Sequence, residues 1–221
     1  IGGVAAVDAD EGAISPGGVG YDINCGVRLV ATRLVEGDIQ KRLPALADSL
    51  FASIPCGVGA EGAIPKLSKA EEKKLASEGV RWAIAQGYGR AEDIEYIEEN
   101  GCLAGADPET LTDDALSRGL TQVGTLGSGN HFLEVDRIEE IYDETVAAAL
   151  GLTVGQIAII IHSGSRGLGH QTCEDALKVM GKAMEKYRLT MPDRQLACAP
   201  VSSPEGQRYL AAMACAANYA W

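Results

Sequence analysis

Short blocks of β-branched residues bounded by glycines alternate along the chain with blocks of helical periodicity. Blocks of the first kind predict strands at 2–9, 26–35, 120–126, 131–136 and 155–162. The last block carries three consecutive isoleucines, Ile159 to Ile161, directly before His162, and it is the clearest buried strand of the chain.

Apolar residues recur at helical spacing in the segments between these strands. Ile39, Leu43, Leu46 and Leu50 predict a helix over 38–53. Further helices are expected at 69–78, 80–87, 91–99, 112–119, 169–188 and 204–221. Strands and helices are mixed without a regular βαβ rhythm, and we find no internal repeat. The pattern therefore favours an α+β fold, with mixed sheets and flanking helices, over a doubly wound sheet.

The length of 221 residues suits one good-sized domain. The chain begins at Ile1 without a methionine, and it stops at Trp221 inside an alanine-rich helical pattern that lacks a stop signal. We therefore expect a single domain over 1–221 that is part of a longer domain, truncated at both ends.

The formal charge of −12 argues against a surface coated with phosphate-binding lysines. The acidity is concentrated, however. Nine acidic residues and no basic one lie between 91 and 114, and six acids with a single base lie between 134 and 144. The rest of the chain is close to neutral, so the net charge does not exclude a nucleic acid as a partner.

Six cysteines, at positions 25, 56, 102, 173, 198 and 215, form neither a CxxC pair nor a dense framework. We see no signal peptide and no apolar run long enough to span a membrane. A reduced cytoplasmic protein without a membrane partner is the simplest interpretation, in which each cysteine is by default a small buried hydrophobic residue.

The segment from Gly57 to Gly62 matches the dinucleotide-binding pattern G-x-G-x-x-G. Its surroundings do not fit, because Pro55 precedes it where a long strand is needed and Pro65 follows where a helix should begin. A turn-rich loop is the better interpretation.

Four residues form a candidate metal site. Asp22 and Cys25 are three residues apart in a glycine-bracketed turn next to the strand at 26–35, so both side chains can converge on one ion. His131 and His162, two of only three histidines, stand at strand–loop junctions rich in Gly and Ser. The alternative is a surface aspartate, a buried cysteine and two structural histidines.

A site that mixes carboxylate, thiolate and imidazole suits a borderline divalent ion such as Mn²⁺, Zn²⁺, Fe²⁺ or Co²⁺. A thiolate can bridge two ions, and paired ions recur in phosphoryl chemistry. The segment from Ser163 to Gly169 then lies between a strand and a helix start, where backbone N–H groups favour a phosphate that Arg166 can hold. A glycine-rich connection with a solvated arginine is the alternative.

Three segments together resemble the RtcB family of RNA-splicing ligases. They are PGGVGYDINCGVR at 16–28, LGSGNHFLEV at 126–135 and IHSGSRGLGHQ at 161–171. The pieces at 196–200 and 205–209 are similar as well. The resemblance extends over the whole chain and corresponds to the middle portion of the family, so we expect that an N-terminal segment and the C-terminal half have no counterpart here.

The resemblance implies a ligase that joins RNA ending in a 2′,3′-cyclic phosphate or 3′-phosphate to RNA with a 5′-hydroxyl, in tRNA splicing or RNA repair, using GTP and two Mn²⁺ ions. Asp22, Cys25 and His131 match the ligands of one manganese, and Cys25 and His162 match ligands of the second, with Cys25 as the bridge. Arg166 matches an arginine that holds an RNA phosphate. The residues that match GTP contacts are Asn130, His131, Phe132, Leu133 and Glu134.

Family members carry GMP on a histidine before transferring it to the RNA. None of His131, His162 and His170 stands in a matching context, so we expect the guanylylated histidine to lie outside this chain and the chain alone to be inactive. Two other functions are compatible with the sequence. One is a metal-dependent phosphoesterase that acts on RNA ends, and the other is a non-catalytic RNA-binding fragment.

Overall fold

The computed structural model describes residues 4–221, and the chain forms two compact units. Unit 1 contains the N-terminal segment up to Asn24, Lys66–Thr121 and Gly164–Trp221, and unit 2 contains Cys25–Pro65 and Gln122–Ser163. Helices and small sheets occur in both units, so the predicted α+β fold is confirmed. Among the described residues, none of the helices is both long and apolar enough to cross a bilayer.

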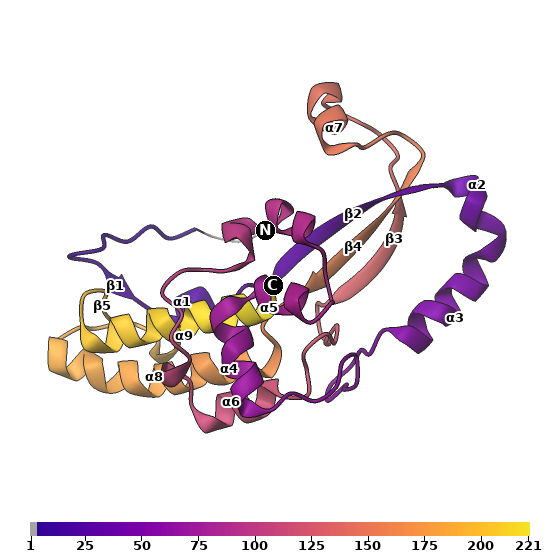
Figure 1. Cartoon of the computed structure of the whole chain (residues 1–221). Coiled ribbons are helices and arrows are strands. Elements are labelled where there is room, and N and C mark those ends of the chain that lie inside the picture. Colours follow the sequence, from indigo (N-terminus) through magenta and orange to yellow (C-terminus); the bar gives the residue numbers. More distant parts are fainter. Residues whose placement is uncertain (1–3) are drawn as a thin grey trace. The chain divides into compact units, whose positions relative to one another are not determined.

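Unit 2 is built on a three-stranded antiparallel sheet in the order β2-β4-β3 (Figure 1). The strands are β2 (Gly26–Val35), β3 (Phe132–Arg137) and β4 (Gln156–Ser163). The central strand β4 contains the isoleucine run, whose β-branched side chains suit a pleated sheet. The helices of unit 2 are α2 (Glu36–Ile39), the 3₁₀ helix η1 (Gln40–Arg42), α3 (Leu43–Ser53) and α7 (Glu144–Leu150).

Unit 1 is mainly helical, and a short antiparallel pair, β1 (Ala13–Ile14) with β5 (Ala199–Pro200), joins distant segments. Its long helices α8 (Arg166–Tyr187) and α9 (Pro204–Ala220) lie side by side in Figure 1 and share a core that includes Met180 and Tyr209. The other helices are α1 (Pro16–Val19), α4 (Lys69–Glu78), α5 (Val80–Ala85), η2 (Ala91–Tyr96), η3 (Glu98–Gly101), η4 (Pro108–Thr110), α6 (Asp113–Gly119) and η5 (Arg194–Leu196).

Several predicted elements are confirmed, and their local chemistry explains why. The helix predicted at 69–78 is α4, which begins with a capping box: the Ser68 hydroxyl accepts from the Glu71 amide, and the Glu71 carboxylate accepts from the Ser68 amide. Ser203 caps α9 in front of Pro204. The strands predicted at 26–35, 131–136 and 155–162 are β2, β3 and β4, within one residue at each end.

The strand predicted at 2–9 is wrong over residues 4–9, and residues 2 and 3 lie outside the described part of the chain. Val4 is fully exposed, so it has no apolar surface to pack against. The Asp8 carboxylate accepts from the amides of Asp10 and Glu11, and the Asp8 carbonyl accepts from Gly12. These bonds close a turn that ends the extended run.

The strand predicted at 120–126 is also wrong, because the segment folds into turns. Gly124 has a φ of +76°, which a glycine adopts without strain. The amide and the hydroxyl of Thr125 both donate to the Gln122 carbonyl, at 3.1 and 2.8 Å. Local hydrogen bonds therefore replace the sheet pairing that the β-branched residues suggested.

Three helix predictions differ in detail from the structure. The helix at 38–53 is divided into α2, η1 and α3, and the segment at 91–99 forms the 3₁₀ helices η2 and η3 in place of an α-helix. Helix α8 begins at Arg166, three residues earlier than expected. Helix α7 was missed, although Asp143 caps its start and Gly151 ends it in the left-handed conformation.

Candidate metal centre

Three of the predicted ligands meet at one edge of the unit 2 sheet because of its antiparallel order. Cys25 directly precedes β2, His131 directly precedes β3, and His162 is the second-last residue of β4. His162 pairs with both Val27 and Phe132 in the sheet register. The starts of the two outer strands and the end of the central strand therefore coincide, which brings the three side chains together.

The Cys25 sulfur lies between the two imidazoles. Its Sγ atom is 3.0 Å from His162 Nε2 and 3.5 Å from His131 Nε2. With bonds of about 2.3 Å to sulfur and about 2.0 Å to nitrogen, two ligands of one ion lie about 3.1 to 3.5 Å apart at angles between about 90 and 110°. Both separations thus fit a thiolate that shares an ion with each histidine.

A backbone carbonyl beside His131 determines the tautomer of its imidazole. Its Nδ1 lies 3.1 Å from the Leu126 carbonyl oxygen. A carbonyl can only accept, so Nδ1 carries the proton and Nε2 presents its lone pair toward Cys25. The same carbonyl accepts a hydrogen bond of 2.8 Å from the Ser163 hydroxyl, and a hydrogen bond from the Leu126 amide to Pro55 fixes the peptide. This arrangement is typical of metal-binding histidines.

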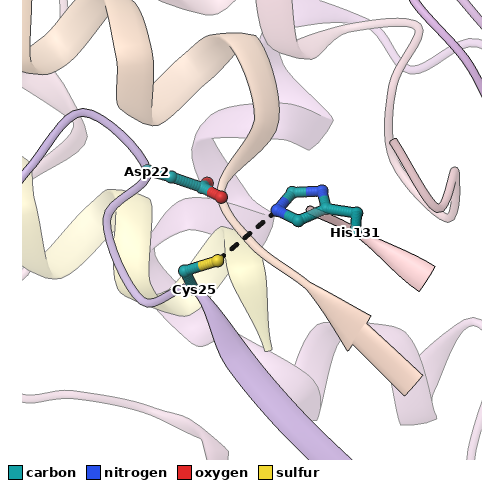
Figure 2. A group of neighbouring side chains, drawn as sticks. All are labelled: Asp22, Cys25 and His131. Atoms are coloured by element: carbon teal, nitrogen blue, oxygen red, sulfur yellow. Dashed lines mark hydrogen bonds between the residues drawn. The ribbon is translucent and has the colours of Figure 1, made fainter. Parts of the chain in front are cut away.

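Asp22 completes the group that Figure 2 draws. Ligand atoms of Asp22, Cys25 and His131 all lie within 4.8 Å of one another, with Cys25 exposed and the other two half-buried. The turn between Asp22 and Cys25 contains Asn24 in the left-handed conformation, with φ of +56°. The Asn24 side-chain amide donates to the Ala217 carbonyl at 3.0 Å, which holds the turn in this conformation.

A glycine makes room for the Asp22 carboxylate. A Cβ atom at Gly164 would collide with both carboxylate oxygens of Asp22. Ser165, the next residue, is fully buried and its hydroxyl is 3.5 Å from Asp22 Oδ1. The Gly-Ser sequence after His162 therefore shapes the pocket of a ligand that is more than 140 residues away in sequence.

Together with His162, the group offers one carboxylate, one thiolate and two imidazoles. Such a mixture suits a borderline divalent transition ion better than Mg²⁺ or Ca²⁺, which prefer oxygen ligands only. The structure brings Asp22, Cys25 and His131 into one group and adds His162 through its contact with Cys25. The residues present thus fit a metal centre.

The residues predicted to contact GTP continue from His131 into β3. Phe132 pairs with His162 and Glu134 pairs with Ile160, so Phe132 and Glu134 lie on the same sheet face as His162. The Phe132 ring makes an edge contact with the His162 ring, at a centroid distance of 5.3 Å. Asn130 and Glu134 are exposed, and Leu133 belongs to the opposite face by strand alternation.

Arg166 begins α8 with a φ of +51°, which is strained for a residue with a Cβ atom. Its Nε is buried and lacks a hydrogen-bond partner in the described part of the chain. A strained backbone and an unsatisfied donor are features of ligand-binding positions. His170, one turn later, is exposed and stacks at 5.0 Å from Tyr21.

Two supporting features were not found from the sequence. The Leu126 carbonyl that orients His131 belongs to the backbone, which no residue pattern marks. The G-x-G-x-x-G loop at 57–62 was interpreted as a turn-rich loop, and Gly57, Gly59 and Gly62 do adopt positive φ values. Its start supports the site, because the Gly57 amide donates to the Gly127 carbonyl at 2.7 Å, next to Leu126.

Comparisons with known proteins agree with one another. The family model described as "tRNA-splicing ligase RtcB" matches residues 1–221. The chain is 52% identical over 221 residues to the tRNA-splicing ligase RtcB of Methanococcus maripaludis, covering 100% of this chain and 46% of that protein. It is 53% identical over 223 residues to the tRNA-splicing ligase RtcB of Aeropyrum pernix, covering 100% of this chain and 46% of that protein.

A bacterial relative gives the same result. The chain is 52% identical over 221 residues to the RNA-splicing ligase RtcB of Mycobacterium tuberculosis, covering 99% of this chain and 51% of that protein. The chain therefore spans about half the length of the curated relatives it matches.

Proposed function

Because the chain belongs to the RtcB family, we propose that it forms the metal-binding part of an RNA ligase. The ligase joins an RNA end that carries a 2′,3′-cyclic phosphate or 3′-phosphate to an RNA end with a 5′-hydroxyl, and it uses GTP and Mn²⁺. The observation that carries this proposal is the position of the Cys25 sulfur, 3.0 and 3.5 Å from the Nε2 atoms of His162 and His131.

The proposed ligand sets divide the four side chains between two ions. Asp22, Cys25 and His131 hold one ion, and their mutual proximity within 4.8 Å supports this set. Cys25 and His162 belong to the second set, which makes Cys25 the bridge. When bound, two such ions supply charge neutralisation at the phosphates and orientation for an in-line displacement.

Other residues of the chain bind and orient the substrates in this proposal. Asn130, His131, Phe132, Leu133 and Glu134 form the GTP-contacting segment, with the exposed Glu134 carboxylate accepting from the guanine edge. Arg166 holds an RNA phosphate through its guanidinium, which supplies paired donors. We also propose that both units belong to one longer catalytic domain.

The proposed chemistry runs through a histidine that is not one of the three in this chain. That imidazole attacks the α-phosphorus of GTP and pyrophosphate leaves. The GMP then passes to an oxygen of the RNA 3′-phosphate, which releases the histidine. A cyclic phosphate first takes up water to give the 3′-phosphate. Finally the 5′-hydroxyl attacks the 3′-phosphate phosphorus, loses its proton, and expels GMP.

An RNA-joining assay on a chimera tests this proposal. The chain replaces the matching segment of the Methanococcus maripaludis ligase, to which it is 52% identical. We expect joining of a cyclic-phosphate RNA to a 5′-hydroxyl RNA that requires both GTP and Mn²⁺. Cys25→Ala should lower the rate by about 100-fold or more, whereas Cys56→Ala, an exposed free cysteine of the same unit, should leave it unchanged.

Three outcomes contradict the proposal. If RNA joining continues after Cys25→Ala or after chelation of Mn²⁺, the metal centre is not required for the reaction. Release of the terminal phosphate without joining indicates a phosphoesterase. Binding of RNA with neither reaction indicates a binding module.

A further inference from the structure

Unit 1 contains a hollow that the proposed ligation does not use. Its volume is about 320 Å³, and it is lined by residues of α8, α9 and the segment at 110–112. None of Asp22, Cys25, His131 and His162 is among the lining residues. The size is at the lower end of small-molecule pockets, so it admits one ring system rather than a base pair or a large ligand.

The walls of the hollow are largely apolar, and its rim is polar. Leu111, Ala176, Val179, Met180 and Ala212 supply aliphatic surface, with Met180 fully buried. Hydroxyl groups of threonine lie among the lining residues at positions 110, 112 and 172. An occupant with flat apolar faces and hydrogen-bonding edges fits this distribution.

The ring of Tyr209 is part of the wall of this hollow. Tyr209 lines it and is only 2% exposed, and its hydroxyl is buried without a hydrogen-bond partner among the described residues. Burial raises the pKa of the Tyr209 phenol well above its ordinary value, so the group stays a neutral donor. The hydroxyl is closed off from solvent, so the ring of Tyr209, and not its hydroxyl, faces an occupant of the hollow.

A row of lysines borders the hollow. A second depression of about 290 Å³ shares Val179 and Glu205 with the first and is lined by Lys178, Lys182 and Lys186. These lysines are four residues apart on α8, so they lie on one helix face at intervals of about 6 Å. Arg208 adds a basic group to the lining of the first hollow, and its guanidinium donates to the Thr110 carbonyl at 3.5 Å.

The acidic neighbours of the lysines do not prevent anion binding. Lys178 pairs with Asp175 at 3.1 Å and Lys186 pairs with Glu205 at 2.8 Å, and both lysines are more than half exposed. Because the lysine end of each pair is open to solvent, a phosphate can approach these ammonium groups. Lys182 forms no ion pair within the described part of the chain, and it lies between the other two.

We propose that the hollow between α8 and α9 binds one nucleotide, with the base in the apolar hollow and the phosphate on the lysine row. A nucleobase has flat apolar faces, which the walls match, and polar edges, which the threonine hydroxyl oxygens and the Arg208 guanidinium can meet. The adjacent lysines match its phosphate. The assignment of this nucleotide to an RNA strand rests on the proposed function. A free nucleotide presents the same chemistry, and the test separates the two sources.

The experiment measures binding to the 221-residue chain in EDTA by heteronuclear NMR, with AMP, GMP and a short oligoribonucleotide that has hydroxyls at both ends. We expect shifts at Thr110, Thr112 and Ala212 with at least one of these probes. Ala176→Leu, which fills the hollow, should weaken binding by about tenfold or more. Lys182→Gln should weaken it about fivefold, and Lys74→Gln, a lysine outside both depressions on α4, should not change it.

Each result decides the inference. Binding of the oligoribonucleotide alone assigns the site to RNA, and binding of a mononucleotide alone assigns it to a free nucleotide. Absence of binding by all three probes overturns the proposal, as does a loss in Lys74→Gln equal to that in Lys182→Gln. If Ala176→Leu unfolds the chain, Val179→Glu replaces it, because this exposed residue lines both depressions and a carboxylate there should repel the phosphate and weaken binding about fivefold. The binding experiment contains neither a metal ion nor the reacting phosphate, because EDTA removes the ion and the RNA has hydroxyls at both ends. A negative result in this experiment would therefore not contradict the proposed ligase function.

Discussion

Replacement of Glu72 by glutamine is expected to remove a loss of stability that the chain suffers as the pH rises. Glu72 lies in α4 and is fully buried, and neither carboxylate oxygen has a hydrogen-bond partner within the described residues. The side chain packs against Gly119, where a Cβ atom would collide with it. Burial raises the pKa of Glu72 from 4.5 to about 8, although Lys69 acts in the opposite direction.

The sign of the effect follows from proton binding. Between pH 4.5 and about 8 the unfolded chain has released the Glu72 proton while the folded chain keeps it. The contribution of Glu72 is therefore fully present below the unfolded pKa, and it declines as the pH rises through this window, by about 1.4 kcal/mol per unit. From about pH 5 to about pH 7.5 the unfolding free energy should fall by roughly 3 kcal/mol because of this one group.

Urea unfolding at about pH 5 and about pH 7.5 measures this difference. Glutamine has the same size and cannot ionise, so the Glu72→Gln variant should lack this part of the pH dependence. Glu78→Gln is the matched control, because Glu78 is a carboxylate at the exposed end of the same helix. If the unaltered chain and Glu72→Gln lose the same free energy between the two pH values, the argument from burial is refuted.

Two further predictions concern the metal centre. In a titration with Mn²⁺ followed by elemental analysis, Cys25→Ala should lose about two ions and His131→Ala or His162→Ala about one each, because a bridging thiolate serves both ions; equal losses in all three variants would contradict bridging. Gly164→Ala should weaken Mn²⁺ binding and lower the unfolding free energy by about 1–3 kcal/mol, since the added methyl collides with Asp22. Gly181→Ala, in open space on α8, should leave Mn²⁺ binding unchanged and raise stability by up to about 1 kcal/mol.

Local chemistry accounts for the parts of the fold that could be predicted from the sequence. Helix α4 carries its own capping box at Ser68 and Glu71, and β4 carries its isoleucine run, so each is determined within a few residues. The failed strand at 120–126 shows the opposite case. Its β-branched residues suit a strand, but Gly124 and the hydrogen bonds of Thr125 close a turn, and no periodicity marks that outcome.

The candidate site could be predicted in its residues but not in its supports. His131 and His162 were recognisable because both stand at strand–loop junctions, and Cys25 because it precedes a strand. The supports depend on contacts between distant segments, such as the Leu126 carbonyl on His131 and the Asn24 amide on Ala217, which is 193 residues away. The burial of Glu72 is likewise a property of packed helices rather than of its own sequence neighbourhood.

The ligands of the metal centre can converge only if the backbone around them leaves enough space. A three-stranded antiparallel sheet places two strand starts and one strand end at the same edge, which suffices for Cys25, His131 and His162. The carboxylate of Asp22 comes from the turn before β2. That turn needs Asn24 in the left-handed conformation, and the carboxylate needs the missing side chain of Gly164. The small residue at position 164 thus provides the space that the Asp22 carboxylate occupies.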